Sequence, residues 1–442
     1  LKEHYLIILI LLLYMPNKYQ LFSLKLFLYL IPIGIVTGPF IPDLCVTLIV
    51  LIFIYLSFTN NLWRNYFNNR ITIFFLLFNL YLIIISLTSD NIFLSLKSSL
   101  FYFRFFIFSL AVWYILDNTQ NLFKRNYSIY LFLLFLLISL DAMFQYRQGY
   151  NILGYKPVEI DRISSFFNDR MVLGGFIVRM LALTISLFLT YSLINKKKIY
   201  SFILYNLLVI TIILSGERTA LGLFFILLFL WVLIHRDRIK FLLIILIPVI
   251  IIIIISSVDK KVQYRLFIEP LHQSNLISES FLEKYYSNQK KGYVNETKNL
   301  IIFSKEHTQH YKTAFKIFLS NPITGIGPKM YRIKCSEKKF NSGIESCSTH
   351  PHNIIMQLLA ETGLIGLLFY IVMLYFIISR IIKYWLSSFN IKRENLIEIA
   401  CLITFVLNLF PFLPSGNIFN NWLSILFYFP LGFYLYQNRI EK

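Results

Sequence analysis

Long apolar segments separated by short polar stretches run through most of this chain. Each is close to the roughly 20 residues that a helix needs to cross a bilayer. One soluble core could not cover so many helices that are apolar on every side. Membrane-spanning helices are therefore predicted at twelve ranges: 21–37, 41–58, 72–88, 96–116, 128–144, 171–194, 199–215, 219–235, 240–256, 353–379, 397–413 and 419–437. A shorter apolar run at 5–15 is a thirteenth candidate.

Composition and charge support this interpretation. The 442 residues are 57% hydrophobic and only 14% charged, whereas a soluble domain carries about 25% charged residues. The net charge of +20 would suggest nucleic-acid binding in a soluble protein. Here the basic residues cluster in short loops, as they do on the cytoplasmic side of membrane proteins. We therefore expect an all-α polytopic membrane protein with no nucleic-acid partner.

The basic loops also predict the topology. They fall in alternate loops, at Arg64, Arg70, Lys124, Arg125, 196–198, Arg236, Arg238, Lys240, Arg380, Lys383, Lys392 and Arg393. Placing all of them in the cytoplasm leaves 145–170, 215–218 and 257–352 on the outer side. The expected organisation is an N-terminal bundle at 1–256, a large outer loop at 257–352 that forms a small helical cap, and C-terminal helices at 353–442.

A histidine stands where the long loop meets the next predicted membrane helix. Pro351 favours the start of a helix, which puts His352 and Asn353 at its outer end. A histidine there could take a proton from a hydroxyl near neutral pH. The alternative is an interfacial histidine that only caps the helix. Further along, Gly363 and Gly366 would let a neighbouring helix or a lipid chain approach closely.

Arginines form a second group of candidates on the outer side. Arg218 lies at the outer end of a predicted helix, where a guanidinium is costly without an anionic partner. Its planar fork suits a diphosphate, although an arginine that reaches to the membrane surface would explain it equally well. Arg162, in the polar loop at 145–170, could contact sugars or phosphate.

Two cysteines, Cys335 and Cys347, lie twelve residues apart in the long outer loop. A disulfide between them would stabilise the loop by roughly 3 kcal/mol. A zinc site that includes His350 and His352 is the rival interpretation, but the spacing fits no standard zinc pattern. We therefore expect the disulfide and no metal site.

The residues around His352 resemble a known signature. His352-Asn353, nine residues and then Gly363-x-x-Gly366 are similar to the pattern of the bacterial O-antigen ligase and O-antigen polymerase superfamily. The run Asn-Pro-Ile-Thr-Gly-Ile-Gly-Pro at 321–328 looks like the family's Asn-Pro-Gly turn. The resemblance implies that His352 acts on the acceptor hydroxyl and that Asn353 holds the imidazole or a sugar hydroxyl.

The segment 215–222 resembles the family's Ser-Arg-Gly-Ala element, with Glu217 inserted before Arg218. The arginine of this element is thought to hold the diphosphate of a lipid donor. Many members carry a further arginine upstream of the Asn-Pro-Gly turn, and that position here is His307. The second diphosphate contact therefore stays open between His307, Arg265 and Arg332.

The resemblance implies an inverting, metal-independent glycosyltransferase with a GT-C-like helix arrangement and no cofactor. Its donor would be a glycan on undecaprenyl diphosphate, at the periplasmic face of a bacterial inner membrane. The acceptor would be lipid A–core for a ligase, which we favour, or a lipid-linked glycan for a polymerase. A protein hydroxyl is a third acceptor. A lipid-glycan transporter is the rival class, but it predicts ionisable residues in mid-membrane, whereas Arg218 and His352 are expected at the boundary.

Overall fold

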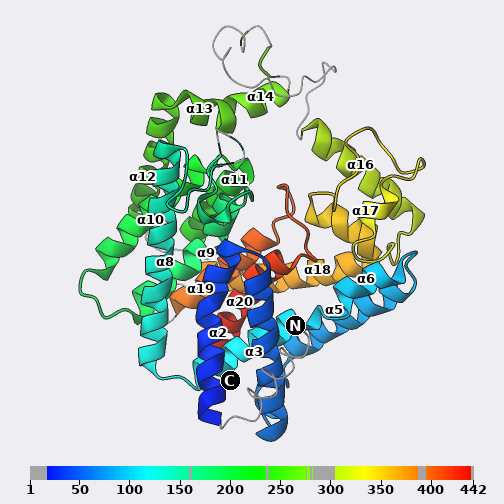
Figure 1. Cartoon of the computed structure of the whole chain (residues 1–442), viewed down its shortest axis with the longest axis horizontal. Coiled ribbons are helices and arrows are strands. Elements are labelled where there is room, and N and C mark those ends of the chain that lie inside the picture. The colour runs from blue at the N-terminus through cyan, green and yellow to red at the C-terminus, as the bar shows by residue number, and fades with distance from the viewer. Residues whose placement is uncertain are drawn as a thin grey trace.

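The computed structural model describes residues 17–157, 159, 162–234, 238–274, 276–278, 281, 304–386 and 395–439. Regular structure in these residues is helical, apart from one isolated β-bridge between Glu159 and Arg162. Figure 1 shows a bundle of long helices that carries shorter helices at one end. We call the end that carries α13, α14, α16 and α17 the loop end. The candidate helix at 5–15 lies outside the described residues.

A helix falls on each of the twelve ranges predicted from the apolar pattern. These helices are α2 (Asn17–Thr37), α3 (Phe40–Thr59), α5 (Arg70–Leu87), α6 (Ile92–Ser99) with α7 (Phe103–Asp117), α8 (Asn121–Gln148), α9 (Leu173–Tyr191), α10 (Lys197–Leu214), α11 (Arg218–Ile234), α12 (Arg238–Val258), α18 (Ile354–Leu386), α19 (Asn395–Asn408) and α20 (Asn421–Asn438). Among the described residues, eight helical segments, with α6 and α7 taken together, are long and apolar enough to cross a membrane. The chain is thus a multi-pass membrane protein.

Helices α9 and α7 form the centre of the bundle. The apolar part of α9 is 83% buried, because α8, α10 and α19 pack around it. Helix α20 lies along α7 at the closest distance that side chains permit: a Cβ on Gly432 would stand 2.5 Å from Cβ of Val112. The Ser109 hydroxyl also donates to the carbonyl of Tyr428, at 2.8 Å. A small residue and a hydroxyl thus hold these two helices together, as is usual in membrane bundles.

The range 96–116, predicted as one helix, is divided between α6 and α7. Serine hydroxyls explain how the short helix α6 is held on α5: Ser86 Oγ lies 2.9 Å from Ser95 Oγ and 2.7 Å from Ser99 Oγ. These three side chains are buried and satisfy one another. Helix α6 therefore covers the loop end of α5 before the chain turns into α7.

Helix α18 is also interrupted, at Gly363, where φ is 59° and ψ is −162°. The turn at 322–327 fills the break, and its backbone bonds to both halves of the helix. Ile326 and Gly327 donate to the carbonyls of Ala360 and Glu361, at 3.1 and 2.9 Å. After the break, Leu364 donates to the Pro322 carbonyl at 2.9 Å. The interrupted backbone is therefore paired inside the protein, as it must be away from water.

The described parts of the segment between α12 and α18 combine helices with non-helical turns, the latter at 321–330 and 335–353. Helices α13 (Lys260–Gln263) and α14 (Glu269–Gln273), with the π-helix η2 (Tyr264–Ile268) between them, continue from α12. Helices α16 (Lys305–Ser320) and α17 (Tyr331–Lys334) lie beside α6 (Figure 1). Residues 282–303 lie outside the description. The part with α16 and α17 has a small core of its own, made by Ala314, Ile317, Ile326, Met330, Tyr331, Cys335, Phe340 and Ala360.

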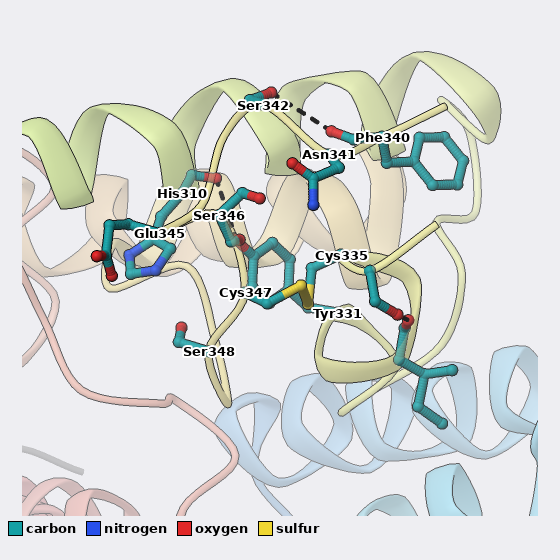
Figure 2. The surroundings of a disulfide bond; sticks show 12 residues. His310, Tyr331, Cys335, Phe340, Asn341, Ser342, Glu345, Ser346, Cys347 and Ser348 are labelled. Atoms are coloured by element: carbon teal, nitrogen blue, oxygen red, sulfur yellow. Dashed lines mark hydrogen bonds between the residues drawn. A yellow bond between two sulfur atoms is a disulfide. The ribbon is translucent and has the colours of Figure 1, made fainter. Parts of the chain in front are cut away.

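A disulfide joins Cys335 and Cys347 within this core, with their Cα atoms 5.1 Å apart. Figure 2 shows it beside Tyr331, whose hydroxyl donates to the Ser346 carbonyl at 2.8 Å. Both sulfurs are engaged in this bond, so they do not act as zinc ligands here. The disulfide closes the loop that leads directly into His350 and His352.

Replacing Cys335 and Cys347 together with serine is expected to destabilise the segment with α16 and α17 by about 3 kcal/mol, because the open loop gains entropy when it unfolds. Limited proteolysis of the purified protein, followed by mass spectrometry, would detect the loss as faster cleavage within 304–350. Replacing the free buried Cys45 with serine is the control, and its cleavage rate in this segment should stay that of the parent. Equal rates in all three proteins would contradict a stabilising disulfide.

Candidate active site

A cavity of about 800 Å³ opens at the loop end, between the first turns of α9 and α11 and the segments that precede α18 and α20. Of the residues that the structure describes, its wall carries one acidic side chain, Glu217, and many basic ones: Arg162, Arg170, Arg179, Arg218, Arg265, His307, His350 and His352. Five guanidiniums around one cavity create a strongly positive potential, which favours an anionic ligand. The cavity therefore combines an anion site with imidazoles that can exchange protons.

Arg218, the first residue of α11, is held by short polar contacts. Its guanidinium forms an ion pair with Glu269 and donates to the Arg265 carbonyl and to Gln273 Oε1, both at 3.0 Å. Arg265 reaches the same Glu269 carboxylate at 3.0 Å. The two guanidiniums thus share one partly buried carboxylate, which keeps both of them oriented into the cavity without neutralising their combined charge.

Arg162 and Arg265 meet at a second carboxylate, that of Glu159, with N–O distances of 3.8 and 3.4 Å. These distances are long for ion pairs, and the Glu159 side chain is 42% exposed. Such contacts contribute little stability and can be exchanged for a ligand. Three arginines predicted separately from the sequence, Arg162, Arg218 and Arg265, therefore converge on one wall of the cavity, which we call the arginine wall.

Glu217, the residue inserted before Arg218, is half-buried and accepts two backbone hydrogen bonds. The donors are the amides of Gly174 and Gly175 in the first turn of α9, at 2.7 and 3.0 Å. Burial raises the pKa of this carboxyl to about 7, although Arg162, both glycine amides and Arg179 act in the opposite direction. Glu217 therefore joins the start of α9 to the start of α11 and fixes the arginine wall.

Four histidines from two distant segments form a cluster: His307 and His310 on α16, and His350 and His352 just before α18. The ring of His352 lies 4.1 Å from that of His350, 5.2 Å from that of His310 and 5.6 Å from that of His307, measured between ring centres. His352 also has a φ of 55°, in the left-handed region that few residues other than glycine adopt. Its carbonyl accepts from the Ser415 amide at 2.8 Å, which helps to hold this conformation. Strained backbone of this kind is concentrated at functional sites.

The cluster keeps its imidazoles neutral. Burial lowers the pKa of His352 to about 4, and the charges that His307 and His310 would carry lower it further. The pKa values of His310 and His350 are also lowered by burial, to about 4 and about 3. A neutral imidazole has a free lone pair, so His352 can accept a proton at pH 7. An anion bound among the arginines would raise its pKa and make it a stronger base.

Acidification from pH 7 to pH 4.5 is expected to destabilise the protein. These histidines bind protons less readily when folded than when unfolded, where the pKa is about 6.5, so the unfolded state gains protons first. The contribution of the neutral histidines to the free energy of unfolding is fully present above about pH 6.5, and it is lost as the pH falls towards 4. Thermal denaturation at several pH values would detect the loss, and it should be smaller in His310→Gln. An unchanged melting temperature between pH 7 and pH 4.5 would contradict neutral burial of the cluster.

Other predicted residues lie outside the cavity wall. Asn353 caps α18 through the Met356 amide, at 3.1 Å, and donates to the Pro411 carbonyl at 2.8 Å. Gly363 lies in the break of α18, and Gly366 lines a separate apolar cleft. Arg332 is exposed on α17 and donates to the Thr349 carbonyl at 3.4 Å. Of the three candidates for a second diphosphate contact, the structure thus places Arg265 and His307 in the cavity.

Three residues of the cavity wall were not predicted from the sequence to have a role there: Arg170, Arg179 and Glu217. Arg179 had a signal, because an ionisable residue inside the apolar run at 171–194 is a candidate functional residue by itself. Arg179 as a whole residue is 7% exposed, and its guanidinium donates to the Gly175 carbonyl at 2.9 Å. Arg170 gave no distinctive pattern, since it stands in a polar loop with other charged residues.

The helical bundle and its basic cavity define a multi-pass membrane protein with a site for an anionic ligand. Residues 203–371 match the family model described as O-antigen ligase. This match covers α11, the segment with the disulfide, His352 and the break in α18, and it supports the resemblance of this part of the chain to the O-antigen ligase and polymerase superfamily. No curated protein matches the chain.

Proposed function

We propose that this protein transfers a glycan from undecaprenyl diphosphate to an acceptor hydroxyl at the periplasmic face of a bacterial inner membrane. The observation that carries the proposal is the cavity in which Arg162, Arg218 and Arg265 face His352. The basic loops at the opposite end of the bundle support a cytoplasmic location for that end. The site would then meet donors that have reached the outer leaflet.

The arginine wall would hold the donor diphosphate. A diphosphate accepts bidentate, charge-assisted hydrogen bonds from guanidiniums, and it would replace the weak contacts to Glu159. Arg218 and Arg265 stay oriented by Glu269. Their charges would stabilise the diphosphate as it leaves, when its negative charge is greatest. His307 lies close enough to His352 to add a further donor to the same anion.

The chemistry is a displacement at the anomeric carbon of the donor sugar. The acceptor oxygen forms the new bond to this carbon, the bond from the carbon to the diphosphate oxygen breaks, and the acceptor proton passes to His352. Undecaprenyl diphosphate leaves with the bonding electrons. Attack from the face opposite the leaving group inverts the anomeric configuration. The arginines here supply the charge that a metal ion would otherwise provide.

We favour lipid A–core as the acceptor, which makes the protein a ligase. A polymerase would use the same donor and the same residues with a second lipid-linked glycan as acceptor. The two activities differ only in the acceptor molecule whose hydroxyl lies next to His352. An assay that offers each acceptor separately therefore distinguishes them.

The test is a transfer assay with the purified protein and a glycan on undecaprenyl diphosphate. Lipid A–core is offered in one reaction and further lipid-linked glycan in another. We expect product on lipid A–core, and a fall in rate of about a hundredfold or more in Arg218→Gln, because one preorganised charge at the leaving group is lost. The matched control is Arg125→Gln, at the opposite end of the bundle.

A ladder of longer lipid-linked chains would identify a polymerase instead. Transfer that is equally fast in Arg218→Gln would contradict the assignment of the arginine wall. Absence of transfer to either acceptor, with the donor still bound, would reopen the transporter interpretation.

A further inference from the structure

A second group of basic side chains lies outside the cavity, where the turn that fills the break of α18 lies against α6 and leads into α17. We call Lys97, Lys329 and Arg332 the second basic cluster. Burial is the largest cause that lowers the pKa of Lys329. The positive charges of Arg332, Lys97 and Arg104 lower it further, and the Glu361 carboxylate acts in the opposite direction. Arg104 is already paired with Asp43, at 2.5 Å. In the part of the chain that the structure describes, the ammonium groups of Lys97 and Lys329 form no ion pair.

Lys329 is half-buried, and its backbone is fixed in a position that lysine rarely adopts, with a φ of 62°. Neighbouring contacts hold it there. A Cβ on Gly327 would stand 2.7 Å from Cβ of Ser89, so the turn is pressed against the loop end of α5. On the other side, the Glu361 carboxylate accepts from the Lys329 backbone and, at 3.1 Å, from the Tyr331 amide. A strained backbone that carries an unpaired ammonium is typical of a binding site rather than of a purely structural turn.

A buried chain of hydrogen bonds connects this turn with the cavity. Glu361 accepts from Gln357 Nε2 at 2.9 Å, and the same amide nitrogen donates to Asn417 Oδ1 at 2.8 Å. Asn417 lines the cavity. On the surface, Arg332 makes the corresponding link, because it bonds to the Thr349 carbonyl and its charge lowers the pKa of His350. The two basic regions therefore lie on either side of the segment that carries His352.

We propose that the second basic cluster binds a lipid-borne phosphate, that of the acceptor. This inference rests on the proposed function, in which the arginine wall takes the donor diphosphate and His352 stands between donor and acceptor. Both acceptor classes, lipid A–core and a lipid-linked glycan, carry phosphate at the membrane surface. Lysine ammonium groups bind phosphate as compact point charges. The ammonium groups of Lys97 and Lys329 form no ion pair among the described residues, so their charge is available for such an anion. Arg218 and Arg265, by contrast, are both paired with the Glu269 carboxylate.

The test measures binding instead of transfer, so that it does not depend on the proposed reaction. Full-length protein with Arg218→Gln, which weakens the arginine wall, is placed in nanodiscs of uncharged lipid. Undecaprenyl diphosphate, lipid A and phosphatidylglycerol are titrated in separate experiments. We expect one of the first two probes to bind, and Lys329→Gln to weaken that binding by about tenfold, the usual effect of removing one charged hydrogen-bond donor.

Lys338→Gln is the matched control, because this exposed lysine lies in the same segment but outside the cluster. It should leave binding unchanged. Lys329-dependent binding of lipid A identifies a ligase-type acceptor, and Lys329-dependent binding of undecaprenyl diphosphate a polymerase-type acceptor. Phosphatidylglycerol bound equally well would show a general contact with lipid headgroups and overturn the acceptor assignment. Binding that Lys329→Gln leaves unaltered would overturn the site itself.

The binding test of the second basic cluster can succeed or fail independently of the transfer assay that tests the proposed function. Lys329-dependent binding in a protein that transfers nothing would support this site and contradict the transferase. Conversely, in an active protein Lys329→Gln is expected to raise the KM for the acceptor by about tenfold, while kcat and the KM for the donor stay unchanged. A fall in kcat alone would instead indicate that Lys329 only supports the fold of the turn.

Discussion

Replacing His352 with alanine is expected to lower kcat for glycan transfer by about a thousandfold, the middle of the range that general acid–base catalysis contributes. The acceptor hydroxyl would then lose the neutral imidazole that is proposed to receive its proton. The donor should still bind, because the arginine wall is untouched. Single-turnover transfer with saturating donor measures the chemical step directly, and a separate binding titration with the donor verifies that its Kd is preserved.

The control for this result is His310→Gln. His310 lies 5.2 Å from the His352 ring but is not part of the cavity wall. We expect its replacement to change kcat less than tenfold, since it acts on His352 only through packing and charge. An alanine variant of His352 that keeps more than a tenth of the parent activity would show that another group accepts the proton. His350, whose ring is the nearest, would then be the next candidate.

The second large effect is expected from Gly363→Ala, on stability. The backbone of Gly363 occupies a region of φ and ψ that is almost exclusive to glycine, and a Cβ there would stand 2.3 Å from the Ile323 carbonyl oxygen. The turn would have to leave the break of α18. We expect a loss of about 3 kcal/mol or more, detected as a lower melting temperature and as rapid proteolysis within residues 304–350.

Gly38→Ala is the matched control for this variant. A Cβ on Gly38 meets nothing within 4 Å, and no left-handed φ is required there. Its melting temperature should stay within a degree or two of the parent, as is usual for surface substitutions. A Gly363→Ala protein as stable as this control would mean that α18 can close its break without the turn.

Much of the helical bundle was predictable, because the length of an apolar run is a local property of the sequence. The site was partly predictable for a different reason. The topology inferred from the basic loops placed Arg162, Arg218 and His352 on one side of the membrane, and the structure brings all three to one cavity. Polar residues at the same end of a helical bundle lie close to one another, so they often line the same cavity.

The remaining features depend on contacts between distant segments. The break in α18 requires a turn that begins about 40 residues earlier, so the apolar pattern predicts an uninterrupted helix there. His307 and His310 reach His350 and His352 only after α16 has packed against α18. Glu217 looked like a small departure from a motif, and its bonds to Gly174 and Gly175 could not be inferred from the sequence.

The turn that occupies the break of α18 also has a consequence for the order in which the protein matures. During translation, the Asn-Pro-Gly turn emerges from the ribosome before the two halves of the helix that will hold it. Until residues 360–364 have been synthesised, the amides of Ile326 and Gly327 lack their final acceptors. The geometry of the cavity around His352 is therefore completed late, after the first nine of the twelve predicted membrane helices have been made. A nascent chain stalled before this point would carry the arginine wall but no ordered His352.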